Sequence, residues 1–228
     1  MDVLYFFKKR TQFIRYYYET AGLPFFETKR KIENEEAPYD DPPYSEDGEP
    51  PYLDQWIEAD EALEVLGRTC LSMLSPSLKL YFGTWEKELG IIWDNGERDR
   101  VFKKGFLKGY RKCFEKVLRI SWDHCPADLE LIEQITLARN RDQHPDEIAS
   151  MRVRYAKNDL KKYPRPFFMS ESDKDLLDNL EIGSGIWMNP SVYVSRDTLY
   201  GAITETERLA EWLEEYMFAA RYNQAKYI

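Results

Sequence analysis

The 228-residue sequence lacks any run of eighteen or more apolar residues, which argues against a membrane-spanning helix. Its first residues, MDVLYFFKKRTQFIRYYYE, carry charges every few positions and so lack the basic end, apolar stretch and small-residue cleavage site of a secretory signal. We expect a cytoplasmic protein with no membrane partner. The 43% hydrophobic and 15% aromatic content is enough to bury a sizeable core.

The sequence is also poor in cysteine and histidine. Its three cysteines, Cys70, Cys113 and Cys125, are odd in number, widely spaced and without a CxxC pair, which excludes a disulfide framework and a zinc knuckle. His124 next to Cys125 has no second ligand pair, so we interpret these two residues as a partly buried pair at a helix end. The paired carboxylates of a two-metal nuclease are missing too, and we expect neither a metal nor a cofactor.

The net charge of −9 hides an uneven distribution along the chain. Residues 33–61 hold twelve acidic residues and no lysine or arginine, so the rest of the chain is +3. Residues 98–119 carry nine basic and two acidic residues, a net +7, and residues 139–165 carry eight basic and four acidic residues, a net +4. Because charge acts locally, the two basic segments keep RNA among the candidate partners of this acidic protein.

Five prolines lie between positions 38 and 51 of the acidic segment, which predicts a solvated loop over residues 33–52. Two roles are open for this loop. It could lie over the basic segments and compete with RNA, a restraint that salt would weaken. It could instead only make the chain more soluble, without holding a fixed position.

Apolar residues at helical spacing predict a mainly α-helical protein. The first helix is expected over residues 3–21, with Gly22 and Pro24 ending it. A second helix is expected after the acidic loop. Beyond Pro76 it either continues or gives way to a new helix, because proline is tolerated in a first turn, and Gly90 is the expected stop.

The basic segment 98–119 places its apolar residues three or four apart, which predicts a helix with a buried face surrounded by lysines and arginines. The residues of that face are Phe102, Phe106, Tyr110, Cys113, Phe114 and Val117. Such a helix is often merely solvated, so a role in holding nucleic acid is one of two interpretations.

Two further helices are expected over residues 128–143, where Asp128 follows a proline as a cap, and near residues 146–162. Aromatic and β-branched residues beside prolines and glycines predict short extended segments near residues 164–195. A long C-terminal helix then starts at Ser195.

The stretch ITLARNRDQHPDE, residues 135–147, ends a predicted helix with a polar cluster that includes one of the two histidines. At about 100° per residue, Asn140 and His144 share a helical face, whereas Arg139 lies roughly 140° from His144. Arg139 therefore reaches the imidazole only through its long side chain or through a distorted last turn. Pro145 favours such a distortion, because it disfavours a helical conformation at His144.

An arginine, an amide and an imidazole are sufficient to cleave RNA without a metal. The arginine can hold the scissile phosphate and stabilise its developing charge, and the histidine can take or give a proton as the ribose 2'-OH attacks. A simpler explanation is a helical interaction protein in which the histidine only ends a helix.

RNRDQH resembles the RNxxxH form of the Arg-polar-x3-His signature of the HEPN superfamily, all-helical domains found in prokaryotic toxin and phage-defence ribonucleases. The resemblance is closest over residues 129–145 and looser over residues 53–220. It implies a HEPN-like helical bundle and a metal-independent endoribonuclease that leaves a 2',3'-cyclic phosphate. By the same resemblance Arg139 and His144 are catalytic, Asn140 orients them, and two copies of the motif meet across a homodimer interface.

On this interpretation the chain divides into an N-terminal helix packed on the bundle (residues 1–32), the acidic proline-rich loop (33–52) and a HEPN-like domain (53–228). We expect a ribonuclease that acts as a toxin or antiviral defence effector, with an inhibitory or regulatory protein partner as a further candidate. The residues expected to bind RNA are Lys103, Lys104, Lys108, Arg111, Lys112 and Arg141. The alternative is a non-catalytic HEPN-like module that binds a nucleotide or a protein partner.

Overall fold

The computed structural model describes residues 1–41, 48–144, 150–179 and 189–225. Within these residues the chain is mainly α-helical and contains no β-strand, which confirms the expected fold class. None of the helices in these stretches is both long and apolar enough to cross a membrane.

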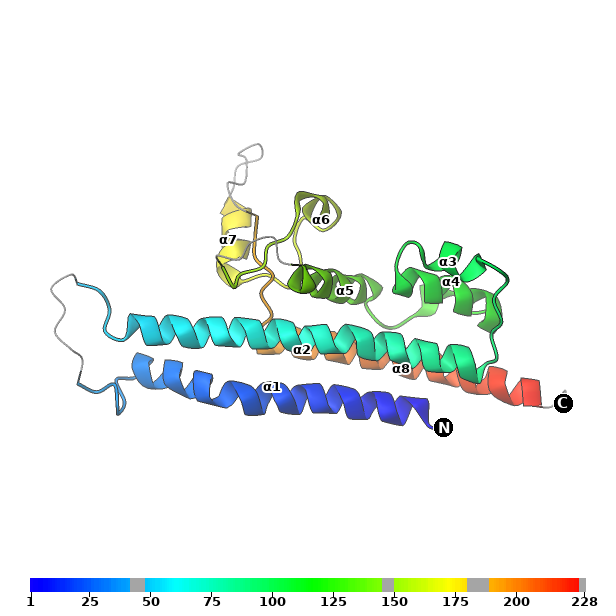
Figure 1. Cartoon of the computed structure of the whole chain (residues 1–228), viewed down its shortest axis with the longest axis horizontal. Helices are drawn as coiled ribbons and strands as arrows, with labels where there is room; N and C mark the ends of the chain where they lie inside the picture. The colour runs from blue at the N-terminus through cyan, green and yellow to red at the C-terminus, as the bar shows by residue number, and fades with distance from the viewer. Residues whose placement is uncertain (42–47, 145–149, 180–188, 226–228) are drawn as a thin grey trace. The chain divides into compact units, whose positions relative to one another are not determined.

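The helices follow one another along the chain (Figure 1). In order they are α1 (Val3–Glu33), α2 (Leu53–Glu88), α3 (Glu97–Phe102), α4 (Phe106–Leu118), the 3-10 helix η1 (Trp122–His124), α5 (Leu129–Gln143), α6 (Lys157–Lys162), α7 (Glu171–Asn179) and α8 (Arg196–Ala225).

The chain forms two compact units, and each unit is assembled from separate stretches of sequence. The helices α1, α2, α5 and α8 each contribute residues to both. These units do not test the domain boundaries expected after residues 32 and 52, which remain a prediction. The first unit comprises Met1–Phe13, Met73–Thr136 and Tyr200–Ile228, and the second comprises Ile14–Ser72 and Leu137–Leu199.

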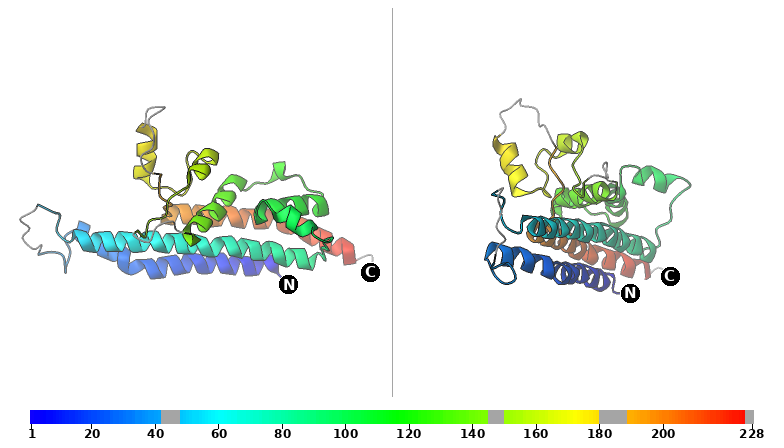
Figure 2. Two further views of the ribbon diagram at one scale, coloured as in Figure 1. Left: turned by 45° about the horizontal axis from the view of Figure 1, so that its top comes forward. Right: turned by 60° about the vertical axis from the view of Figure 1, so that its left-hand side comes forward.

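The first unit has a core in which the start of α1, the second half of α2 and most of α8 run side by side (Figure 2). The buried Tyr81 hydroxyl donates to the carbonyl oxygen of Ala210 at 2.9 Å and to the Glu214 carboxylate at 2.8 Å. The indole N–H of Trp85 donates to the same carboxylate at 3.0 Å. Burial raises the pKa of Glu214, and these donors compensate part of that cost.

The second unit depends on a close approach at Gly67 of α2. A Cβ at this position would lie 2.1 Å from the carbonyl oxygen of Val194, so only glycine lets the chain pack here without a shift. Next to this contact, Arg154 and Ser191 form an isolated antiparallel bridge. The backbone N–H of Val192 donates to the carbonyl of Val153 at 2.7 Å.

The extended segments expected near residues 164–195 are therefore confined, within the described residues, to this bridge and its flanks. Residues 171–179 form α7 instead of an extended segment. Its start is capped, because Ser170 Oγ accepts from the backbone N–H of Asp173 at 3.1 Å.

The first helix does not end at Gly22 and Pro24, as expected, but continues to Glu33. Pro24 is exposed, so water can satisfy the carbonyl that loses its helical donor. Gly22 is buried, and a Cβ there would approach Leu66 of α2 to 3.3 Å. Tertiary packing of α1 thus overrides the local stop signal.

The second helix likewise runs without a break through Pro76, which settles the two alternatives left by the sequence. Its predicted stop at Gly90 is confirmed. Gly90 has a φ of 59°, its N–H donates to the carbonyl of Lys87 at 3.0 Å, and the N–H of Ile91 donates to Glu86 at 3.1 Å. These are the two hydrogen bonds of a Schellman motif.

The basic segment 98–119 is not one helix, as expected, but two, α3 and α4, which lie against each other (Figure 1). The chain breaks at Gly105, whose φ of 101° is accessible to glycine and strained for other residues. At Gly109 a Cβ would meet the ring of Phe102 at 2.6 Å, so this glycine lets α3 pack closely on α4. In the expected buried face, Val117 is exposed.

The remaining helix predictions have mixed outcomes. The predicted helix over 128–143 is α5, and Asp128 caps it by accepting from the N–H of Leu131 at 2.9 Å. Ser195 begins α8 as expected, because its Oγ accepts from the N–H of Thr198 at 3.2 Å. The helix expected near 146–162 is reduced to the six residues of α6, since residues 150–156 are not helical and residues 145–149 lie outside the described residues.

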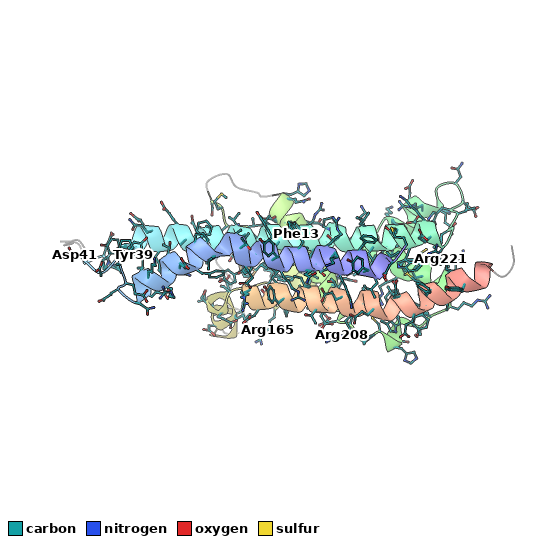
Figure 3. The ribbon with its side chains drawn as sticks, turned by 90° about the horizontal axis from the view of Figure 1, so that it is seen from below. Phe13, Tyr39, Asp41, Arg165, Arg208 and Arg221 are labelled. Atoms are coloured by element: carbon teal, nitrogen blue, oxygen red, sulfur yellow. The ribbon has the colours of Figure 1, made fainter. Side chains whose placement is uncertain are left out.

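The described residues of the acidic loop make contacts with one another. Residues 34–41 and 48–52 form turns and irregular chain, while residues 42–47 lie outside the described residues. The rings of Tyr39 and Tyr52 meet edge to face at 4.9 Å, and the Tyr52 hydroxyl donates to the carbonyl of Asp41 at 2.7 Å. Tyr39 and Asp41 are labelled in Figure 3.

Candidate functional site

The RNRDQH motif occupies the last turns of α5 in the second unit. The helix ends at Gln143, and the backbone N–H of His144 donates to the carbonyl of Arg141 at 3.2 Å, three residues back. This closing turn is tighter than an α-helical turn. His144 is exposed beyond the helix end, in the position that the following proline predicts.

Arg139 and Asn140 are brought together by their side chains. The Arg139 Nη1 donates to Asn140 Oδ1 at 3.0 Å, so the long arginine side chain bends toward the face that Asn140 presents. The Nε of Arg139 is buried and has no hydrogen-bond partner within the described part of the chain. Because this Nε is shielded from solvent, an incoming anionic oxygen would have to bond the outer nitrogens of the guanidinium.

Arg141 and Asp142 face away from Asn140 and anchor the end of α5. Asp142 accepts from Arg68 Nε at 3.3 Å and from Ser72 Oγ at 2.8 Å, both on α2. Its carboxylate is therefore used to fix the end of α5 on α2. At about 100° per residue, positions 139, 143 and 140 share one side of the helix while 141 and 142 lie on the other.

Arg68 holds the chain on both sides of the segment that follows the motif. It is only 3% exposed, and its Nη2 donates to the carbonyl of Met151 at 2.7 Å, in addition to its bond with Asp142. Glu64 lies 3.6 Å from Arg68 Nη1 and 4.0 Å from Arg152 Nε. Burial raises the pKa of Glu64, although the two arginines oppose that shift.

Arg141, which the sequence suggested as an RNA-binding residue, is held by α6. Its Nε donates to Asp159 Oδ2 at 2.6 Å, and the same oxygen accepts from the N–H of Ala156 at 2.9 Å. The ion pair is mostly shielded from solvent, so Arg141 ties α5 to the start of α6. Arg141 therefore serves as an anchor, whereas Asn140 and His144 are exposed.

The other five predicted RNA-binding residues all line one cavity of about 560 Å³ in the first unit. The cavity lies where α3 and α4 pack together and is closed by the chain at η1. Its wall consists of Arg100, Val101, Lys103, Lys104, Lys108, Arg111, Lys112, Glu115, Ser121, Trp122 and Asp123. We call it the basic cavity, because six of these side chains are cationic and two are acidic.

Most of the positive charge in the basic cavity is not neutralised by the protein. Lys108 lies 3.8 Å from the Glu133 carboxylate. Lys103, Lys104 and Lys112 have no carboxylate partner within the stretches that the structure describes. Such a surface attracts phosphates, whose charge these lysines would balance.

Two residues in the wall of the basic cavity, Arg111 and Trp122, are held against each other. The Arg111 guanidinium lies 5.4 Å from the centre of the Trp122 ring, and the Trp122 indole N–H donates to the backbone carbonyl of Arg111 at 3.0 Å. Trp122 also packs on Trp212 of α8, with ring centres 5.3 Å apart. The indole is thus fully used as a support for the arginine.

Sequence reasoning missed Arg68, Ser72 and Asp142, which position the motif. One signal was present: Arg68 interrupts the apolar run ALEVLGRTCLSML, and a cation buried in such a run must find a partner. The choice of Asp142 as that partner depends on tertiary packing. His124 is exposed and Cys125 half-buried, so the expected partial burial holds for the cysteine only. The described residues contain no group of three or more potential metal ligands.

Comparison with protein-family models, with curated proteins and with solved structures finds no match for this chain. The side chains of the motif and of the basic cavity therefore carry the functional proposal.

Proposed function

We propose that this protein is a metal-independent endoribonuclease of the HEPN type, acting as a toxin or antiviral defence effector. One observation carries the proposal: the end of α5 exposes Asn140 and His144 and bonds the Arg139 guanidinium to Asn140, while Asp142 is bonded on the opposite side. Asp142, which has no role in the proposed chemistry, anchors the turn. Asn140 and His144 are therefore free to contact a substrate.

The side chains suit attack of a ribose 2'-OH on the adjacent phosphorus. Arg139 would bond the phosphate oxygens and stabilise the charge that builds on them, and Asn140 would hold the guanidinium in place. An imidazole takes the proton of the 2'-OH as the new P–O bond forms, and the 5'-oxygen leaves with a proton from a second acid. The products are a 2',3'-cyclic phosphate and a free 5'-OH.

A homodimer would supply that second acid. Each motif holds one imidazole, that of His144, so a second copy of the motif would bring a second imidazole as the acid. The helix α1 exposes large aromatic side chains, among them Phe13 in the first unit (Figure 3) and Tyr16 in the second. Exposed apolar surface of this kind is typical of contacts between chains.

RNA binding would rest on the basic cavity. Its unpaired lysines would neutralise backbone phosphates, so the affinity for RNA should fall steeply as salt rises. The acidic net charge of the chain does not oppose this, because screening in physiological salt confines charge effects to about 8 Å.

The deciding experiment compares the two histidines of the chain. His144→Ala should reduce cleavage of RNA by the purified protein at least about 100-fold, because proton transfer is lost, while His124→Ala should leave it unchanged. Cleavage should persist in a chelator and yield cyclic phosphate ends. Undiminished cleavage by His144→Ala would overturn the proposal.

The same variants test the dimer. His144→Ala and Arg139→Ala should each be inactive alone, and mixing them should restore part of the activity if the two motifs form a shared site. A mixture that stays inactive, although the variants exchange subunits, would show that each chain works alone. If the wild-type chain binds RNA or nucleotide but never cuts, the non-catalytic alternative is the correct one.

A further inference from the structure

A second cavity adjoins the basic cavity in the first unit. It has a volume of about 430 Å³ and shares Val101 and Lys112 with the wall of the basic cavity. Its own wall is mainly apolar and includes Ile91, Ile92 and Val117. We call it the apolar groove. A place where an apolar wall meets a cluster of cations suits a ligand that has one flat apolar part and several negative charges.

The side chains of the apolar groove are accessible. Ile92 is 92% exposed, and Val117 is also exposed although Leu107, Cys113 and Phe114 on the same helix are buried. Exposed apolar residues that gather in one groove lose water on binding a ligand, which favours binding. Burial raises the pKa of Cys113 to about 11, so this residue of the wall stays uncharged near neutral pH.

The Glu86 carboxylate fixes one residue of the wall, Trp93. Glu86 accepts from the Trp93 indole N–H at 2.6 Å, from Arg98 Nε at 3.1 Å and from the Tyr110 hydroxyl at 2.6 Å. Trp93 in turn packs edge to face on Phe102, with ring centres 5.7 Å apart. The groove is therefore preformed, which lowers the cost of ordering it around a ligand.

We propose that the apolar groove and the basic cavity form one site for single-stranded RNA, in which an unpaired base enters the groove and the neighbouring phosphates lie on the lysines. This inference rests on the proposed function and names how its substrate is held. A base in a duplex is paired and stacked inside the helix, so only an unpaired base can reach the groove. Six cations are more than one phosphate needs to balance its charge. They suit an RNA backbone, which carries several phosphates.

The test measures binding and not cleavage, so it is independent of whether the protein cuts RNA. The wild-type chain is titrated with a 2'-O-methyl RNA strand of about eight nucleotides, which has no 2'-OH to attack. The same strand without its bases, a blunt duplex of the same sequence, and a free nucleoside triphosphate are compared with it.

Two pairs of variants separate the two parts of the site. Ile92→Ser with Val117→Ser removes apolar contact from the groove without adding charge, and Leu176→Ser on α7 is the matched control at an exposed apolar residue. Lys103→Gln with Lys104→Gln removes charge from the basic cavity. Lys79→Gln, an exposed lysine outside both cavities, is its control.

We expect the groove variant to weaken binding of the intact strand about fivefold or more and to leave binding of the baseless strand unchanged. The lysine variant should weaken binding of both strands and reduce the slope of log affinity against log salt by about 1.4, or about 0.7 per lost phosphate contact. Both controls should bind like the wild type.

Three results would overturn the proposal: equal binding of the intact and baseless strands, equal binding of the duplex, or an undiminished affinity of the groove variant. Displacement of the strand by an equal concentration of the free triphosphate would assign the site to a nucleotide instead. A groove variant that loses only a protein partner would assign the groove to that partner.

Discussion

Arg68 is the residue on which the position of the proposed catalytic turn depends. Its guanidinium joins Asp142 at the end of α5 to the carbonyl of Met151, and all of this occurs at a side chain that is almost wholly removed from solvent. A buried cation is stable only while its partners are in place, and the partners are equally dependent on the cation.

Removing that cation should therefore lower the stability of the fold by more than the loss of one hydrogen bond would. Arg68→Ala should lower the free energy of unfolding by about 3 kcal/mol, because Asp142 and Glu64 lose the charge that compensates them. Arg68→Lys should recover part of the loss, since it keeps the charge but not both donors. Urea denaturation gives the values, and equal stability of Arg68→Ala and wild type would refute this role.

At the scale of elements, Glu86 determines how α2, α3 and α4 meet. Burial by itself would raise the pKa of this carboxyl, but the hydrogen bonds from Arg98, Tyr110 and Trp93 outweigh it and the pKa is lowered. A carboxyl whose pKa is lower in the folded state stabilises the fold above its unfolded pKa. That stabilisation is lost as the pH falls through the folded pKa.

The stability of Glu86→Gln should therefore depend on pH less than that of the wild type. We expect the substitution to lower the free energy of unfolding by about 2 kcal/mol near neutral pH, and the gap to shrink as the pH falls below about 4. Denaturation curves measured across this range give the gap. Glu130→Gln, at an exposed carboxylate on α5, is the control, and a gap of constant size between Glu86→Gln and the wild type would contradict the prediction.

The elements also show how far sequence patterns reach. The stop at Gly90 and the caps at Asp128 and Ser195 were predictable, because backbone geometry and local hydrogen bonds decide them. The continuation of α1 past Pro24 was not, since packing of a long helix outweighs one missing donor. The break at Gly105 was missed because apolar spacing alone does not reveal a change of backbone direction.

The candidate site, too, could be predicted from the sequence only in part. Five of the six basic residues that line the basic cavity were predictable as a cluster, because they are close together in sequence. The contact of Asp142 with Arg68 was not predictable, since it joins residues far apart in the chain. The catalytic roles of Arg139, Asn140 and His144 stay a prediction.

For the whole molecule, the charge imbalance between the acidic segment and the remaining chain is the largest electrostatic feature. In the described part of that segment, some carboxylates already have partners within the second unit. Asp60 pairs with Lys29, whose ammonium also lies 4.0 Å from the centre of the Trp56 ring, and Glu36 pairs with Arg30. The remaining acidic side chains of residues 33–52 are the ones that would compete with RNA in the restraint hypothesis.

Deleting residues 35–50 tests that hypothesis on the full protein. If the loop competes with RNA, its removal should raise RNA affinity severalfold at low salt, and the gain should fade as salt screens the charges. Fluorescence titration at two salt concentrations measures both effects, with replacement of the loop by an uncharged linker of equal length as the control. An affinity that does not change would leave the loop with a solubilising role only.

The double attachment at Arg68 has a consequence for how this chain can vary. Because Asp142 and Met151 bond the same guanidinium, one buried side chain ties the end of α5 to Met151. Doubling the length of a loop costs only about 0.6 kcal/mol of closure entropy. We therefore expect an insertion between Asp142 and Met151 to cost little stability, because the turn that carries His144 keeps its anchor on Arg68.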